Sequence, residues 1–144
     1  MSTTAALSGD DRWAIHDLLA GFCHASDKRD IEALRGYFTE DAEGDLGPAG
    51  LHSGRDAIVA VYEHILTSVP TIDHRVGMIL PTATAEGAYV ESYFTAFYLR
   101  DDQQFTVGGR YEDRLVRTPA GWRIAARRLD GRWTTGEQSV VLPE

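Results

Sequence analysis

Cysteine is almost absent from this chain. Cys23 is the single cysteine in 144 residues, so no disulfide can form within the chain. Long apolar runs are missing too, and none approaches the ~20 residues that a membrane-spanning helix needs. The N-terminal stretch MSTTAALSGDDRW lacks the basic and apolar segments of a signal peptide. These absences predict a cytoplasmic protein outside the secreted and membrane classes.

Positive charge is scarce as well. The chain has 14 Lys and Arg residues against 22 Asp and Glu residues, which gives a formal net charge of −8. Binding to nucleic-acid phosphates or to anionic lipid surfaces relies on a surplus of basic residues. We therefore expect no nucleic-acid partner and no membrane partner.

Several signatures of metal and cofactor chemistry are also missing. None of the five histidines stands in an HxH or HExxH arrangement, and the single cysteine cannot form a Cys/His ligand set. The chain has neither a G-x-S-x-G nucleophile motif nor a glycine-rich phosphate loop. We therefore expect no metal and no cofactor.

The pattern that is present begins with helices. Ser8 and Asp11 resemble a capping box, and the residues after them have helical apolar spacing over about 9–26. A short second helix is expected to begin at Asp30, which fits an N-cap. The segment SGRDAIVAVYEHILTSV predicts a third helix with Ser53 as its N-cap.

The character of the sequence changes after Pro70. The segments that follow are rich in β-branched and aromatic residues and are separated by turn signals such as LPTA, RDDQ and TPAG. Three helices followed by at least four long strands predict an α+β fold, with the helices on one face of a mostly antiparallel sheet. Such strands twist and curl around the helices, which would leave a pocket. We expect a single domain over residues 1–144.

Asp27 is unusual for its place on the first helix. Steps of four residues through Leu19 and Cys23 lead to Asp27, so its carboxylate lies near the apolar stripe. It also stands at the carboxyl end of the helix, where the helix dipole disfavours negative charge by ~0.3–1 kcal/mol. Either Asp27 has a donor partner inside the protein, or the helix frays there and Asp27 is a solvated loop residue. Helical spacing alone leaves both interpretations open.

His74 is the corresponding anomaly among the strands. Alternation along TIDHRVGMIL places it on one face with Ile72, Val76, Met78 and Leu80, where it is the only titratable group. It could be a hydrogen-bonded core histidine or a functional one. A carboxylate bonded to one ring nitrogen would fix the tautomer and leave the other nitrogen free to act as a general base. Pairing with Asp27 would therefore suit proton abstraction.

A family resemblance covers about residues 9–134. The segments ASDKRDIEALRGYFTEDAEGDL, SGRDAIVAVY, DHRV and GGRYEDRLVRTPAGWRIAARR, in this order, resemble the SnoaL-like branch of the NTF2-like superfamily. The resemblance implies a cone-shaped α+β barrel whose three helices close one end of a curved sheet around an apolar pocket. Within the branch the chain is similar to scytalone dehydratase, the bile-acid 7α-dehydratases and hexachlorocyclohexane dehydrochlorinase. These enzymes eliminate water or chloride without a cofactor.

The resemblance extends to three catalytic candidates. Asp27 and His74 match the acid–base dyad of these enzymes, and Arg127 matches an assisting arginine of the dehydrochlorinase. Strict alternation puts Arg127 on the face opposite Trp122, so it reaches the same pocket only if a bulge intervenes or Trp122 faces away. Arg110 and Arg114 are expected on the surface, paired with Glu112 and Asp113. Positions that hold a tyrosine or lysine donor in the family are occupied here by Ser26 and Phe22.

The resemblance also suggests what the pocket holds. The expected function is elimination from a hydrophobic cyclic molecule, such as a polyketide-like or steroid-like compound. A SnoaL-type cyclase, an isomerase and a non-catalytic binding module remain alternatives, because this fold carries many functions. A homodimer or homotrimer is expected, since open sheet surfaces are usually covered. The candidate substrate-binding residues are mostly apolar or aromatic: Leu19, Phe22, Ile58, Tyr62, Met78, Tyr93, Phe94, Phe97 and Tyr111.

Overall fold

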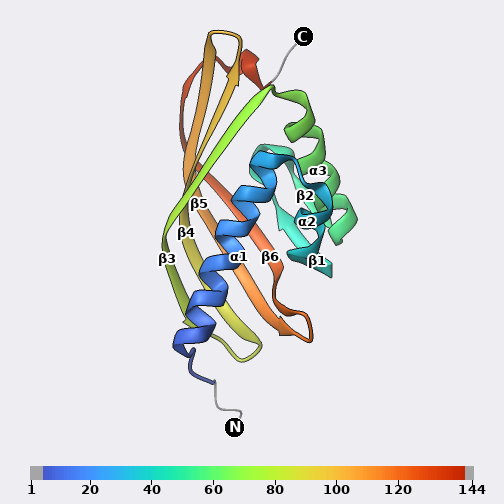
Figure 1. The fold of residues 1–144 in the computed structure, drawn as a ribbon, viewed down its shortest axis with the longest axis vertical. Helices are drawn as coiled ribbons and strands as arrows, with labels where there is room; N and C mark the ends of the chain where they lie inside the picture. The colour runs from blue at the N-terminus through green and yellow to red at the C-terminus, as the bar shows by residue number, and fades with distance from the viewer. Residues whose placement is uncertain (1–4, 142–144) are drawn as a thin grey trace.

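A six-stranded mixed sheet forms the body of the molecule in this computed structural model, which describes residues 5–141. The strand order is β2-β1-β6-β5-β4-β3, and β1 runs parallel to β6 while the other neighbours are antiparallel. The sheet is not closed, so β2 and β3 are its edges (Figure 1). The strands are β1 (Phe38–Asp45), β2 (Leu51–Ser53), β3 (Thr71–Ala83), β4 (Gly87–Arg100), β5 (Gln103–Thr118) and β6 (Gly121–Gly136).

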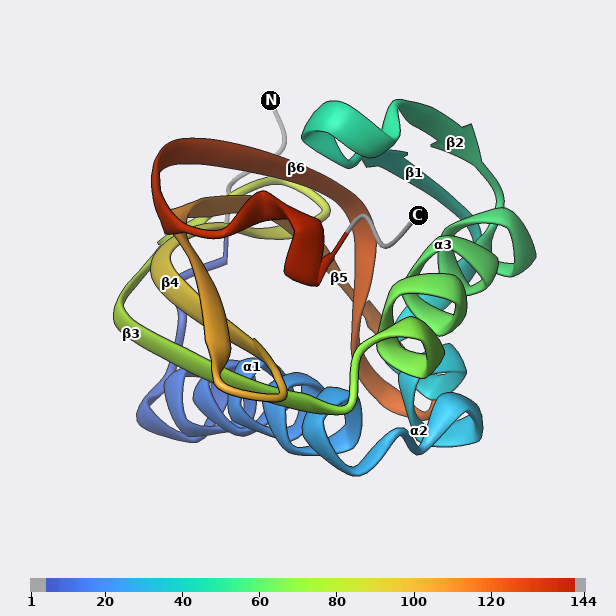
Figure 2. The ribbon, with the colours of Figure 1, turned by 90° about the horizontal axis from the view of Figure 1, so that it is seen from above.

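Three α-helices pack on this sheet: α1 (Gly9–Lys28), α2 (Ile31–Gly36) and α3 (Arg55–Ser68). The long strands curl, and seen from above α1 lies along one side of the molecule while α2 and α3 lie along another (Figure 2). A short 3₁₀ turn, η2 (Gln138–Val140), follows β6. The expected α+β architecture, helices on a curved and mostly antiparallel sheet, is confirmed. No helix in residues 5–141 is long and apolar enough to cross a membrane.

The helix starts follow from local hydrogen bonds. The Ser8 hydroxyl accepts from the Asp11 backbone N–H and the Asp11 carboxylate accepts from the Ser8 backbone N–H, which is the predicted capping box. The Asp30 carboxylate accepts from the Ala33 N–H at the start of α2, also as predicted. The prediction of Ser53 as the cap of α3 was wrong. The N-cap is Gly54 at φ 93°, and the Ser53 hydroxyl donates to Glu43 instead.

The two short strands β1 and β2 were missed in the sequence. Residues 38–53 contain turn-forming glycines and a proline, and β1 carries charged residues on its exposed face. Their strand structure comes from distant pairing, because β1 lies in parallel register with β6 from Phe38–Ile124 to Asp45–Arg128. A local pattern cannot reveal such a partner.

Arg29 connects the end of α1 to the end of α3. It adopts a left-handed backbone conformation at φ 57° and caps α1. Its guanidinium donates to the carbonyls of Leu66, Val69 and Pro70, at distances of 2.7–2.8 Å. The Leu66 carbonyl is in the last turn of α3, where the helix leaves carbonyls without partners, and Val69 and Pro70 follow directly. The connection holds the start of β3 beside the last turn of α1, and so brings Asp27 and His74 close together.

Candidate active site

Asp27 and His74 form a hydrogen-bonded pair. The His74 Nδ1 lies 2.7 Å from Asp27 Oδ1, and the His74 backbone N–H donates to both carboxylate oxygens at 3.1 and 3.0 Å. Because an ionised carboxylate only accepts, Nδ1 carries the proton and Nε2 is left as an acceptor. The imidazole is thus held in the tautomer that a general base requires.

The position of His74 at a sheet edge explains why the carboxylate is needed. Strand β3 pairs with β4 on one side only, where His74 lies opposite Ala96. Its N–H on the open side would be unpaired, and a buried unpaired N–H is costly. Asp27 satisfies that group and orients the ring at the same time. The alternative that Asp27 is a solvated loop residue is therefore wrong. Asp27 lies inside α1, and its carboxylate binds both the backbone N–H and the Nδ1 of His74.

The pair lies at the border between the interior and the solvent. The His74 side chain is 8% exposed and that of Asp27 is 24% exposed. Tyr98 stands edge-on to the imidazole, with 6.4 Å between ring centroids. Burial raises the pKa of Tyr98 to about 12, so its hydroxyl stays protonated at neutral pH. From the sequence, Tyr98 was a possible substitute for the missing donor of the family, together with Tyr93 and Tyr111, and it packs against the core from the inner face of β4.

Arg127 is buried in the interior because a bulge in β6 turns its side chain to the inner face of the sheet. Leu115 pairs with Ile124 and Arg114 pairs with Ala126, so Ala125 is an extra residue without a partner on β5. This insertion shifts the alternation and places Arg127 on the inner face together with Ile124. The sequence required either a bulge or an outward-facing Trp122 for Arg127 to reach the interior. The structure has the bulge.

An ion pair with Asp113 fixes the Arg127 side chain. Arg127 Nε and Nη2 donate to the two Asp113 oxygens at 2.8 and 3.0 Å, and both side chains are 0% exposed. Burial alone would lower the pKa of Arg127, but the Asp113 charge outweighs it and raises the pKa well above its usual range. The guanidinium therefore stays charged.

The predicted partners on β5 were partly wrong. Asp113 faces inward to Arg127, so it is not a partner of Arg110 or Arg114. Glu112 pairs on the surface with Arg128 at 2.8 Å, while Arg110 donates to the Tyr93 hydroxyl. The reason is strand alternation: Asp113 and Glu112 are neighbours and must face opposite sides.

The guanidinium of Arg127 lies between two aromatic rings. Its Cζ is 4.4 Å from the centroid of Phe22 and 4.0 Å from that of Tyr111. Stacking of this kind is favourable for a planar cation removed from water. Phe22 occupies one of the two donor positions of the family, and here its ring supports Arg127. Tyr62 on α3 also contacts Phe22, with 5.2 Å between ring centroids.

The candidate substrate-binding residues divide between the two faces of the sheet. Met78, Tyr93 and Phe97 do not face the interior: Met78 is 77% and Tyr93 50% exposed, and Phe97 lies under Arg75 on the outer face. Phe94 and Phe97 are three residues apart on one strand, so they cannot share a face. The remaining candidates face the interior: Leu19, Phe22, Ile58, Tyr62, Phe94 and Tyr111.

Met78 faces outward because β3 is interrupted. The pairing of β3 with β4 shifts between Gly77 and Leu80, and Met78 has a positive φ of 49°. The shift turns Ile79 toward the core and leaves Leu80 63% exposed. The expected inward row on this strand therefore ends at Val76, two residues beyond His74.

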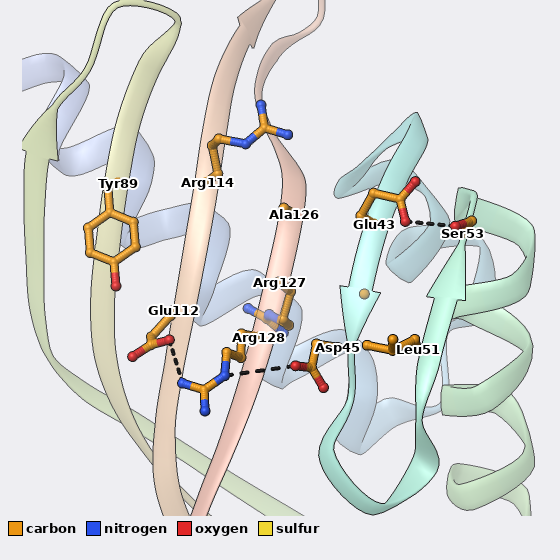
Figure 3. Close-up of a pocket in the computed structure, with 11 residues that line it drawn as sticks. Glu43, Asp45, Leu51, Ser53, Tyr89, Glu112, Arg114, Ala126, Arg127 and Arg128 are labelled. Carbon is orange, nitrogen blue, oxygen red and sulfur yellow. Dashed lines mark hydrogen bonds and ion pairs between the residues drawn. The ribbon is translucent and has the colours of Figure 1, made fainter.

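Solvent reaches several inward-facing side chains beside the dyad. Val76, Tyr98 and Val107 face inward and pack against the core, yet each is only partly buried. A hollow of about 510 Å³ lies on the opposite face of the sheet, away from α1 (Figure 3). That hollow is lined by charged groups such as Glu43, Asp45 and Arg128, so it is not the expected apolar pocket.

Cys23 is buried one turn before Asp27. Burial raises the pKa of its thiol to about 11, and the Asp27 carboxylate adds to this rise while Arg127 opposes it. At pH 7.5 the thiolate fraction is therefore on the order of 10⁻³ or less. We expect iodoacetamide to label native Cys23 at least 10-fold more slowly than urea-unfolded protein, as measured by mass spectrometry. Equal rates in the two states would show that the end of α1 opens readily.

In residues 5–141 no cluster of His, Cys, Asp and Glu side chains has the arrangement of a metal site. The chemistry available here is that of an oriented imidazole, a fixed guanidinium and tyrosine hydroxyls.

Comparison with known proteins gives a family match over most of the chain. Residues 8–128 match the model of the SnoaL-like domain. An uncharacterized protein of Mycobacterium tuberculosis is 32% identical over 123 residues, which covers 81% of this chain and 82% of the relative.

Solved structures show the same fold. A protein from Novosphingobium aromaticivorans described as an aromatic ring hydroxylase is 26% identical, with a TM-score of 0.84 and coverage of 94% and 99% of the two chains. A proposed scytalone dehydratase from the same organism is 24% identical, with a TM-score of 0.81 and coverage of 90% and 89%. A hexachlorocyclohexane dehydrochlorinase from Novosphingobium barchaimii is 16% identical, with a TM-score of 0.77 and coverage of 90% and 91%. At the identities of the last two, the likeness shows the fold alone.

Proposed function

Because the chain belongs to the family of SnoaL-like domains, for which an enzymatic or binding role is supported, we propose that it is a cofactor-independent lyase. The proposed substrate is a hydrophobic cyclic molecule that carries a hydroxyl or halogen leaving group. The observation that carries the proposal is the 2.7 Å contact between His74 Nδ1 and Asp27 Oδ1. It leaves Nε2 as an acceptor at the border between the interior and the solvent.

The proposed reaction begins with proton transfer to His74. Nε2 takes a proton from the carbon next to the one that carries the leaving group, and the C–H electron pair forms the new double bond. The leaving group departs with the electrons of its own bond. A departing hydroxide takes the proton back from Nε2 and becomes water, whereas a halide leaves as the anion and the proton passes to solvent. Asp27 stabilises the imidazolium in between.

The surroundings of the dyad support an apolar ring as substrate. Phe22, Phe94 and Tyr111 provide aromatic surface on the inner faces of α1, β4 and β5. Phe94 and Tyr111 stack, with ring centroids 4.5 Å apart. In this proposal Arg127 donates a hydrogen bond to an uncharged oxygen of the substrate, since its own charge is fixed by Asp113 and it cannot supply a proton.

The proposal is tested by product analysis on a defined panel. Hydroxylated and chlorinated cyclohexane and tetrahydronaphthalene derivatives are incubated with wild-type protein and with His74→Ala. Mass spectrometry and halide detection should find loss of water or HCl with the wild type only. Rearranged or cyclised products of unchanged mass would indicate the isomerase or cyclase alternative. Binding without any conversion would indicate a binding module.

Self-association and cytoplasmic location remain predictions. The outer face of the sheet exposes Met78, Tyr93 and Trp133, which suits a homodimer or homotrimer. Light scattering coupled to size-exclusion chromatography would measure the mass in solution.

A further inference from the structure

Two buried hydrogen-bond donors in the interior have no partner. Among the described residues, the Tyr62 hydroxyl and Arg127 Nη1 are both inaccessible to solvent and unbonded. A buried polar group without a partner is rare and costly, so its presence asks for an explanation. Both side chains contact the ring of Phe22 and therefore lie in the same part of the interior. The other unpartnered atoms belong to Thr39, Arg55, Ser92 and Arg110.

The geometry of the guanidinium shows the direction of the free donor. Nε and Nη2 occupy the edge that faces Asp113. In a planar guanidinium Nη1 lies on the side away from that edge. Because Phe22 and Tyr111 stack on Arg127 Cζ, the Nη1 N–H groups project away from Asp113 and lie beside these rings.

Tyr62 and the dyad border the same interior region. Burial raises the pKa of Tyr62, and the charge and the hydrogen-bonding contact of Arg127 oppose the rise, so the Tyr62 hydroxyl and the guanidinium lie close together although their geometry falls short of a hydrogen bond. The Tyr62 and Asp27 charges both raise the pKa of Tyr98, which in turn lies edge-on to His74.

We infer that Tyr62 Oη and Arg127 Nη1 form a subsite for an uncharged oxygen acceptor of the ligand. Charge as well as geometry favours a neutral acceptor at this position. Asp113 neutralises Arg127 inside the protein, so a second anion at this position would face a buried carboxylate without a compensating cation. A neutral carbonyl or ether oxygen accepts hydrogen bonds from both donors without that penalty. Tyr62 thus supplies, from α3, a donor that the Phe22 and Ser26 positions lack.

The subsite deepens the proposed lyase function and rests on it only for the claim that the ligand is also a substrate. Its test uses binding alone, with three probes of one shape: acetophenone, α-methylstyrene and benzoate. They present C=O, C=CH₂ and a carboxylate on the same ring. Affinities are measured by NMR titration of the wild type and of Tyr62→Phe. Tyr98→Phe is the matched control, since it removes a buried hydroxyl from the same interior and keeps both donors.

The wild type should bind acetophenone roughly 5- to 10-fold more tightly than α-methylstyrene and than benzoate. Tyr62→Phe should remove most of that preference and leave α-methylstyrene unchanged, whereas Tyr98→Phe should keep it. Because Tyr62→Phe deletes an unbonded hydroxyl, its Tm should be unchanged or higher. Equal binding of all three probes, no binding of any, or a preference that survives Tyr62→Phe would overturn the subsite. Failure to find a lyase substrate would leave the binding result intact, so the two proposals fail separately.

Discussion

Replacing Asp113 with asparagine should destabilise the protein by about 3–5 kcal/mol, because it leaves the Arg127 guanidinium buried without its counter-charge. Both side chains of the pair are 0% exposed, so water cannot take over the role of the carboxylate. The amide keeps the size of Asp113 and one acceptor oxygen, which limits the change to charge and one hydrogen bond. The free energy of unfolding is measured by urea denaturation, with the slope of the transition checked for two-state behaviour.

The surface pair one residue away serves as a matched control. Arg128 and Glu112 lie on the same two strands at 2.8 Å, but the Arg128 side chain is 53% exposed. Glu112→Gln should therefore change stability by less than about 1 kcal/mol. The double replacement Asp113→Leu with Arg127→Met should recover much of the loss, because burial of an unpaired charge is then avoided. A loss below 1 kcal/mol in Asp113→Asn would contradict the argument.

Much of the fold could be predicted because its local signals are strong. The apolar spacing of α1, the caps at Ser8 and Asp30 and the strand composition after Pro70 all agree with the structure. Strand β1 could not be predicted, since its parallel partner β6 lies some 80 residues further along the chain. The cap of α3 was misplaced by one residue because Ser53 satisfies Glu43 on the neighbouring strand.

In the candidate site, too, residues marked by the pattern of their own element could be predicted, and residues placed by strand pairing could not. Asp27 and His74 were each anomalous in their own element, a carboxylate near an apolar helix face and a titratable ring on an apolar strand face. The burial of Arg127 depends on one inserted residue, Ala125, and a shift of one residue exchanges the faces of a strand. The same reasoning applies to the shift at Met78. Bulges of this kind leave no clear mark in the sequence, so the inward position of Arg127 stayed conditional and Met78 was assigned to the wrong face.

Replacing Asp27 with asparagine should reduce turnover by roughly 10²–10⁴-fold on any compound that the wild type converts. Asp27 binds two groups of His74, the backbone N–H and Nδ1. The backbone N–H lies 3.0 Å from Oδ2 and 3.1 Å from Oδ1, and we expect the amide oxygen to take the Oδ2 position and accept from it. The amide NH₂ then faces Nδ1 and donates to it, which forces the ring proton onto Nε2. The ring remains in place but the base is lost.

The tautomer can be measured without a substrate. A long-range ¹H–¹⁵N NMR spectrum should show the proton on Nδ1 of His74 in the wild type and on Nε2 in Asp27→Asn. Asp73→Asn is the matched control, because Asp73 is the neighbouring carboxylate but pairs with Arg75 on the surface. It should change neither tautomer nor turnover. If Asp27→Asn keeps the Nδ1 proton and more than about a tenth of the turnover, then Asp27 only covers the edge of β3. If the ring proton moves to Nε2 and turnover falls in the same variant, the reaction requires the tautomer that Asp27 imposes on His74.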